Sequence, residues 1–412
     1  MAVAGEVSFM VFRAQSPFCS RAASQPGDAI KPSIYRVGLT LAALLLFTPL
    51  TWANDKTASL PDLVARIKSI GLKGEGYPAA VAAQKELSSQ GPQALLPLLD
   101  AMEGASPLAV NWLAGALETI ADRSLRAGAV GQEAGSGIPA AAFEKVVLDR
   151  TRSATPRLLA FEWLVKVDPA ARDRLIPGML DDPSADFRRM AVTRLIAAAD
   201  ASKDDAERLD LWKKGLSGAT DEDQVKVLVD HLKSAGVTVD LARHFGYLLE
   251  WNLIGPFDNS GREGFAKTFP PEVSRDLAVP LQGREGEVKW DPFTSTDKMG
   301  EVNLIPIFKN YRDSLAYAVT NYKAAKAGPA QIRLTTPNAW KVWVNGKLVF
   351  ARDEYHRGSM FDQYVIPVTL QEGHNEILLK ICQNEQTEDW AQKWFFKVRI
   401  TDNSGKAILP AE

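Results

Sequence analysis

The side chains of this 412-residue chain that could do chemistry are scattered along it. Its four histidines are never two or four residues apart, and only two cysteines accompany them; the histidines are His231, His244, His356 and His374. Zinc requires three or four close ligands, which this spacing does not supply locally. The chain has no phosphate-binding glycine loop, dinucleotide-binding glycine motif, His-Glu-x-x-His or Gly-x-Ser-x-Gly. We therefore expect no catalytic residue, no metal site and no cofactor.

Clustered carboxylates could still support acid–base chemistry. Residues 181–182, 204–205 and 221–223 are acidic clusters at expected turns or helix starts, where negative charge stabilises a helix N-terminus. Residues 258–261 and 402–405 both have the sequence Asp-Asn-Ser-Gly, but neither continues to the spaced ligands of an EF-hand. We therefore predict structural roles for these clusters.

A secreted hydrolase acting on polysaccharide remains an alternative. Such an enzyme needs two acids that flank a cleft, at a separation that a sequence does not reveal. The acids that could fill these roles are Asp258, Glu263, Asp353 and Glu385.

Aromatic side chains in polar loops are the more informative candidates. Indole and phenol faces stack on sugar rings, while amides and carboxylates bind sugar hydroxyls. Trp340 precedes a predicted hairpin, Tyr355 and His356 follow it, and Trp390 lies in a second polar loop. If these loops share one rim, the four residues form a carbohydrate-binding platform. The alternative is that they pack in the core or across the end of the fold.

The elements that must position these residues differ between the two halves of the chain. Residues 59–245 are rich in Ala and Leu at helical spacing, with Ser59 as an expected N-cap. They predict helix pairs at 93–99 and 107–121, 143–150 and 156–167, 174–180 and 187–199, and 206–216 and 223–235. One pair cannot bury its own apolar face, so stacked pairs in an α-solenoid are expected, with a compact helical bundle as the alternative.

These units resemble HEAT-type helical repeats. The resemblance rests on Asp181-Asp182-Pro183 followed by Arg188-Arg189, and on Pro97 and Pro177, which occupy matching places. It implies a stacked helical array with an extended face for a protein partner.

The second half has the pattern of short strands. Asn345-Gly346 supplies the positive φ angles of a two-residue hairpin turn, which would place Trp343 opposite Leu348 and Val344 opposite Lys347. Further strands are predicted at 251–254, 331–335, 364–370, 376–381 and 394–400. Short strands at this spacing indicate an antiparallel, jelly-roll-like β-sandwich.

Residues 343–349 and 368–380 resemble two groups of β-sandwich modules, the protective-antigen type and the galactose-binding-like jelly roll. The resemblance implies a fold and a binding role. Calcium-dependent adhesins of the first group carry consecutive aspartates before the hairpin, whereas residues 335–338 here are Thr-Thr-Pro-Asn. The departure argues against calcium-dependent sugar binding.

The N-terminus has the pattern of a secretory signal. Residues 37–47 are uncharged and apolar, Lys31 and Arg36 precede them, and cleavage is expected after Ala53. The alternative is an uncleaved membrane anchor. Cleavage would leave Cys382 as the one cysteine, which we expect to be buried in a strand-like run rather than paired with another chain.

The formal net charge of −2 gives no basic excess for binding nucleic acid. We predict a signal region at 1–53, a helical-repeat domain at 54–245 and a β-sandwich at 246–412. The expected function is a non-catalytic interaction protein in the periplasm or outside the cell, with a protein partner on the solenoid and a glycan on the sandwich. It would contact a membrane if the signal stays uncleaved. A third reading makes the sandwich a purely structural cap of the solenoid.

Overall fold

A computed structural model describes residues 58–130, 137–309 and 312–411. The predicted signal region, residues 1–53, lies outside the described residues, as do residues 131–136. In the described part of the chain, no helix is both long and apolar enough to cross a bilayer.

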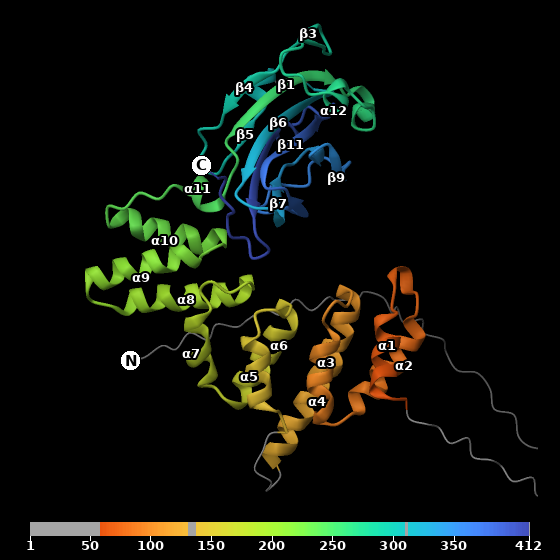
Figure 1. The fold of residues 1–412 in the computed structure, drawn as a ribbon, viewed down its shortest axis with the longest axis vertical. Helices are drawn as coiled ribbons and strands as arrows, with labels where there is room; N and C mark the ends of the chain where they lie inside the picture. The colour runs from red at the N-terminus through yellow and green to blue at the C-terminus, as the bar shows by residue number, and fades with distance from the viewer. Residues whose placement is uncertain (1–57, 131–136, 310–311, 412) are drawn as a thin grey trace, which may run out of the picture. The chain divides into compact units, whose positions relative to one another are not determined.

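The first half of the described chain is helical (Figure 1). Its helices are α1 (Leu60–Lys68), α2 (Tyr77–Ser89), α3 (Leu95–Ala101), α4 (Pro107–Val130), α5 (Ala140–Leu148), α6 (Ala154–Val167), α7 (Ala171–Leu175), α8 (Ala185–Ala201), α9 (Asp205–Gly218), α10 (Glu222–Ser234) and α11 (Leu241–Phe245). Consecutive helices pack together as α1 with α2, α3 with α4, α5 with α6, α8 with α9 and α9 with α10, and α4 also contacts α2 and α6. The predicted pairs match α3 to α10 in position, with α7 extended by a short 3₁₀ turn.

The first helix begins where its sequence indicates. The Ser59 hydroxyl accepts a hydrogen bond from the Asp62 backbone N–H at 3.3 Å, which satisfies one of the free donors of the first turn. Leu63 and Ile67, one turn apart, are fully buried and join the core shared by α1 to α8.

A buried ion pair joins two of the helical units. Both guanidinium NH groups of Arg157 donate to Asp182, at 2.8 and 2.7 Å, and Arg157 Nε donates to the Val147 carbonyl at 2.9 Å. The Asp182 carbonyl accepts a bond from Arg188 Nε at 2.6 Å, and Asp182 Oδ1 accepts one from the Ser184 N–H at 2.9 Å. The aspartate turn on which the repeat resemblance rests therefore connects α6 to α8 through the hydrogen bonds of Asp182.

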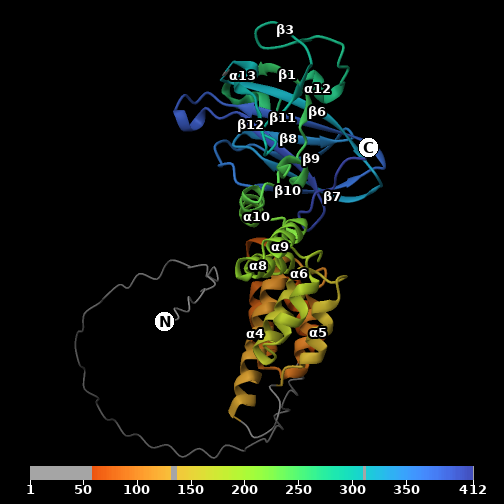
Figure 2. The same ribbon diagram turned by 90° about the vertical axis from the view of Figure 1, so that its left-hand side faces the viewer.

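The second half of the described chain forms antiparallel sheets (Figures 1 and 2). Its strands are β1 (Glu250–Asp258), β2 (Leu281–Gln282), β3 (Glu287–Val288), β4 (Asp291–Thr294), β5 (Val302–Asn303), β6 (Ser314–Ala324), β7 (Gly328–Thr335), β8 (Ala339–Val344), β9 (Lys347–Arg352), β10 (Tyr364–Leu370), β11 (Gly373–Gln383) and β12 (Phe395–Thr401). Short helices α12 (Pro270–Val273) and α13 (Ile305–Phe308) lie among them. One sheet has the order β4-β1-β6-β11-β8-β9, a second has β10-β7-β12-β5, and β2 pairs with β3.

The two larger sheets share one apolar core. The six-stranded sheet contributes Trp340 and Ile377, for example, and the four-stranded sheet contributes Ile332 and Phe396. The opposite face of the six-stranded sheet is also covered, by residues of the segment between β1 and β4. This sheet is therefore buried on both faces.

The predicted hairpin is confirmed. Trp343 pairs with Leu348 and Val344 with Lys347, and Asn345 and Gly346 have φ angles of +50° and +77°. Cys382 on β11 is fully buried, as expected, and burial raises the pKa of its thiol to about 12. Its ionisation to a reactive thiolate is thereby disfavoured.

An arginine links the last helix to the sheets. Arg399 on β12 donates from Nε to Asp362 Oδ1 at 2.7 Å and from NH1 to the Phe245 carbonyl at 3.1 Å. Its guanidinium lies 5.5 Å from the Phe245 ring centroid and 4.6 Å from that of Phe361. The contact between helical and sheet residues here therefore involves none of the predicted loop aromatics.

Candidate functional site

Three of the four predicted ligand-binding residues lie together with a buried amide. Tyr355 and His356 follow β9, and Asn384 and Trp390 follow β11. We call these four residues the aromatic rim. They come from two loops more than 20 residues apart in the chain, which matches the expectation that the polar loops meet.

Trp390 is the exposed member of the aromatic rim. It lies in a short 3₁₀ turn, and 60% of its surface is accessible. The His356 ring packs edge-on against it, with centroids 4.9 Å apart and planes at 80°. A large indole held in place yet open to solvent offers a flat apolar face for a ligand.

His356 is held by its backbone and by its ring. It adopts a positive φ of +59°, and its N–H donates to the Pro337 carbonyl at 2.6 Å. Its ring Nε2 lies 3.0 Å from Nδ2 of Asn384, which is fully buried. A positive φ is unfavourable for a residue with a Cβ, so these contacts keep the ring in this position.

Tyr355 supports the rim through contacts on its buried side. Its hydroxyl accepts a hydrogen bond from Asn259 Nδ2 at 3.0 Å, and Arg262 lies 5.4 Å above its ring. The ring packs against the apolar cluster on the face of the six-stranded sheet that the β1–β4 segment covers, which we call the outer core. This burial raises the pKa of the phenol. Tyr355 therefore contributes to the support of the rim more than to its surface.

Trp340 does not belong to the rim, which corrects its prediction as a ligand-binding residue. It is fully buried on β8, and its ring packs 5.0 Å from the rings of Phe350 and Tyr364. The strand alternation directs Trp340 into the core between the sheets. The next tryptophan on the strand, Trp343, is buried on the opposite face.

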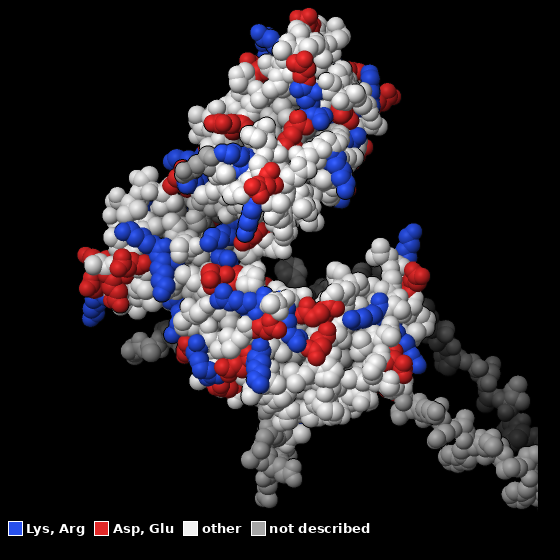
Figure 3. Space-filling view, viewed as in Figure 1, with Lys and Arg blue, Asp and Glu red and all other residues white. Residues whose placement is uncertain are grey.

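Three arginines beside the rim are paired with acids. Arg262 Nε donates to Glu385 Oε2 at 3.0 Å, and this bond holds the pKa of Glu385 below its usual range. Arg352 and Arg357 both form ion pairs with Glu354. Lysines and arginines are interspersed with acids over the face shown in Figure 3. Each of these three arginines therefore has an acidic partner.

Two of the four acids named for a hydrolase, Asp258 and Glu385, do not show the environment of a general acid. The Ser260 hydroxyl bonds to Asp258 and lowers the pKa of that carboxyl. The bond from Arg262 likewise holds Glu385 in its charged form. A general acid at neutral pH needs a raised pKa. Burial raises the pKa of one carboxyl in this region, that of Asp313, which sequence reasoning did not select.

Sequence reasoning missed two buried amides, Asn259, which donates to Tyr355, and Asn384 of the rim. Each directly follows a strand, β1 and β11 respectively, and both strands pair with β6. The Asn259 N–H donates to the Asp313 carbonyl, and the Asp313 N–H donates to the Asn384 carbonyl. Strand order would have brought the two asparagines to one edge, but the order was not known from the sequence.

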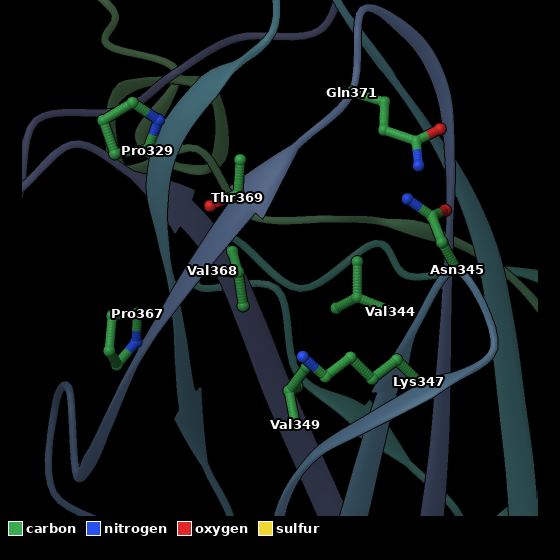
Figure 4. A pocket seen from close by; sticks show the side chains of 9 residues that line it. All are labelled: Pro329, Val344, Asn345, Lys347, Val349, Pro367, Val368, Thr369 and Gln371. Atoms are coloured by element: carbon green, nitrogen blue, oxygen red, sulfur yellow. The ribbon is translucent and has the colours of Figure 1, made fainter.

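A groove lies elsewhere on the sheets, between their edge strands β9 and β10 (Figure 4). It has a volume of about 590 Å³. Its walls are largely aliphatic, with a few polar groups; the lining residues are Pro329, Val344, Asn345, Lys347, Val349, Pro367, Val368, Thr369 and Gln371. It holds no aromatic ring and is separate from the aromatic rim.

The described residues contain no cluster of three or more His, Cys, Asp or Glu side chains that could hold a metal ion. Among the described residues, Lys380 is a lysine buried in the outer core, and its ammonium group is bonded to other groups of the protein. Its Nζ bonds to Glu272 at 2.8 Å and to the Phe265 and Lys267 carbonyls, and burial lowers its pKa. This cluster is satisfied by the protein itself.

Comparison with known proteins finds no matching family model and no matching curated protein. Among solved structures, a β-glucosidase from Kluyveromyces marxianus matches at a TM-score of 0.24 and 10% identity, over 37% of this chain and 16% of that one. An anti-sigma factor domain-containing protein from Clostridium clariflavum matches at 0.23 and 14%, over 40% and 45%. A β-glucuronidase from an uncultured Clostridium matches at 0.21 and 10%, over 38% and 28%. The chain spans less than half of each of these structures, and TM-scores this low assign neither fold nor function.

Proposed function

We propose that the protein is an exported interaction protein whose β-sandwich binds carbohydrate at the aromatic rim. The observation that carries the proposal is the exposed Trp390 ring, fixed against His356 beside the buried amide of Asn384. A sugar ring can stack on the indole, and its hydroxyls can bond to the imidazole and to nearby amides. In this proposal the two larger sheets form a jelly-roll-like sandwich of the protective-antigen or galactose-binding type.

A glycan array of the purified protein, followed by titration of the best glycan, tests the rim. Trp390→Ala should weaken binding by about two- to thirteenfold, because an aromatic stacking contact is worth about 0.5–1.5 kcal/mol. Leu348→Ala is the matched control, since this exposed apolar residue lies on β9 beside the groove. Equal binding by Trp390→Ala and the parent protein would remove the rim as the glycan site.

For the helical half, we propose a HEAT-like solenoid that binds a protein partner. An exposed apolar set on α2, α4 and the turn before α2 supports this role; it consists of Leu72, Tyr77, Val81 and Leu108. Tyr77 also packs edge-on against Trp112, with centroids 5.8 Å apart. Exposed apolar patches are common at protein interfaces, and we propose that these four side chains form one. A pull-down with Tyr77→Ser and Leu108→Ser, compared with the parent, should lose a specific partner.

Export is proposed from the sequence of residues 1–53. Sequencing the N-terminus of protein recovered from the periplasm or medium should give Asn54 as the first residue. An intact N-terminus in the membrane fraction would support the anchor instead, and recovery from the cytosol would refute export.

The hydrolase alternative is tested with the same glycans. Incubation followed by measurement of new reducing ends would detect cleavage, and loss of cleavage on changing one acid would establish an enzyme. The paired state of Glu385 and the lowered pKa of Asp258 favour the binding proposal over this one.

The cap alternative requires the sandwich to bury its loop aromatics against the solenoid. The helical contact instead uses Phe361 and Arg399, while Trp390 stays exposed. A structural contribution of the sandwich to the solenoid is compatible with a free rim.

A further inference from the structure

The tautomer of His356 follows from the orientation of Asn384. Asn384 Oδ1 faces the backbone N–H of Gln386 at 3.4 Å, and this N–H can only donate. Asn384 Nδ2 is therefore the atom that faces Gln386 Oε1 and His356 Nε2, each at 3.0 Å. An amide nitrogen only donates, so His356 Nε2 must accept. A neutral imidazole has one donor and one acceptor, which places its hydrogen on Nδ1.

Asn384 has little freedom to change this arrangement. It is fully buried, its N–H donates to Gln383 Oε1 at 3.2 Å, and its carbonyl accepts from the Asp313 N–H at 3.1 Å. On the other side, the His356 ring contacts Trp390. His356 Nδ1 has no hydrogen-bond partner among the residues described, so a ligand can accept its hydrogen.

We propose that Asn384 is a positioning residue that fixes the Nδ1–H tautomer of His356, and that this N–H selects acetamido sugars at the aromatic rim. The inference rests on the proposed carbohydrate function. An acetamido group combines a planar amide, whose carbonyl is a strong acceptor, with an apolar methyl end. The rim offers the matching pair, an imidazole N–H donor beside an open indole face.

The local charges favour a neutral sugar over an acidic one. Arg262 is engaged by Glu385, and Arg352 and Arg357 are engaged by Glu354. A carboxylate on the sugar would have to displace one of these acids to gain a bidentate arginine contact. The acetamido carbonyl needs no such exchange.

The tautomer is measured without any ligand. Long-range ¹H–¹⁵N spectra of the ¹⁵N-histidine-labelled protein, recorded at about pH 8.5 to keep histidines neutral, resolve which nitrogen carries hydrogen, and His356→Phe identifies the signal. We expect Nδ1–H in the parent protein and a change to Nε2–H in Asn384→Asp, whose carboxylate accepts. The Nε2–H form in the parent, or no change in Asn384→Asp, overturns the positioning role. Thr387→Glu adds the same charge to an exposed neighbouring site and should leave the tautomer unchanged.

The selection is measured by titrating methyl N-acetylglucosaminide and methyl glucoside into the full protein, with tryptophan fluorescence as the signal. The acetamido sugar should bind about tenfold more tightly, and Asn384→Asp should abolish this preference while Thr387→Glu keeps it. His356→Phe keeps a ring without the donor and tests the same loss if Asn384→Asp folds poorly. Equal binding of the two sugars refutes the selection alone. Binding of neither sugar, nor of any array glycan, refutes the proposed function as well.

Discussion

Removing the charge of Asp182 should destabilise the helical half strongly. Asp182→Asn keeps the size of the side chain, but its NH₂ group faces a guanidinium N–H of Arg157 instead of accepting from it. Arg157 is 1% exposed, so its charge has no access to water. Breaking a buried pair on one side costs about 3–5 kcal/mol. The equilibrium constant for unfolding should therefore rise by roughly two to almost four powers of ten.

The assay is urea unfolding of the full protein, followed by circular dichroism at about 222 nm, where helices dominate the signal. The variants are Asp182→Asn, Arg157→Met and the double variant. The double variant should recover most of the loss, because it leaves no uncompensated charge, and its coupling energy isolates the pair. Lys226→Met is the control, since it breaks the exposed pair with Asp230.

Two results would refute this reasoning. One is an Asp182→Asn midpoint that matches that of Lys226→Met, which would mean that water reaches Arg157. The other is a double variant no more stable than Asp182→Asn, which would mean that the turn itself, and not the charge balance, carries the loss.

Three further predictions concern the sheets. Trp340→Ala should lower the free energy of unfolding by about 3–5 kcal/mol, while Trp390→Ala should change it by less than about 0.5 kcal/mol in the same urea titration. Cys382, in a Cys19→Ser background, should resist iodoacetamide at about pH 9 until urea is added. Because the folded thiol has its pKa raised to about 12 from 9.0, the unfolded chain loses this proton first and stability should fall as pH rises above 9, which unfolding at several pH values measures. Gly346→Ala should cost about 1–2 kcal/mol in unfolding, since φ is +77° and the new Cβ meets nothing closer than 3.6 Å.

Turn chemistry and periodicity were the reliable signals in this sequence. Asn345-Gly346 predicted the two β8–β9 pairs next to the turn, because the turn type fixes the pairing there, but not the register shift between Trp343 and Val342. The helix pairs were also located by their apolar spacing. The arrangement of these pairs as a solenoid stays a prediction.

The strand β6 was not predicted, although it pairs with both β1 and β11. Its residues 315–319 are all buried, so they show no alternation between polar and apolar positions. A continuous apolar run of this length does not distinguish strand from helix. The same double burial explains the error at Trp340, since neither face of β8 is open and strand parity alone could not identify a surface residue.

The edge strands beside the groove have a consequence for handling the protein. An unpaired strand edge is a template on which a second chain can extend the sheet and start a fibril. On β10 the exposed edge residue Pro367 has no N–H to offer, and on β9 the exposed Lys347 would place its charge between the joining chains. Replacing both would convert a protected edge into an aggregation site, so these two positions should be left intact in any engineered variant.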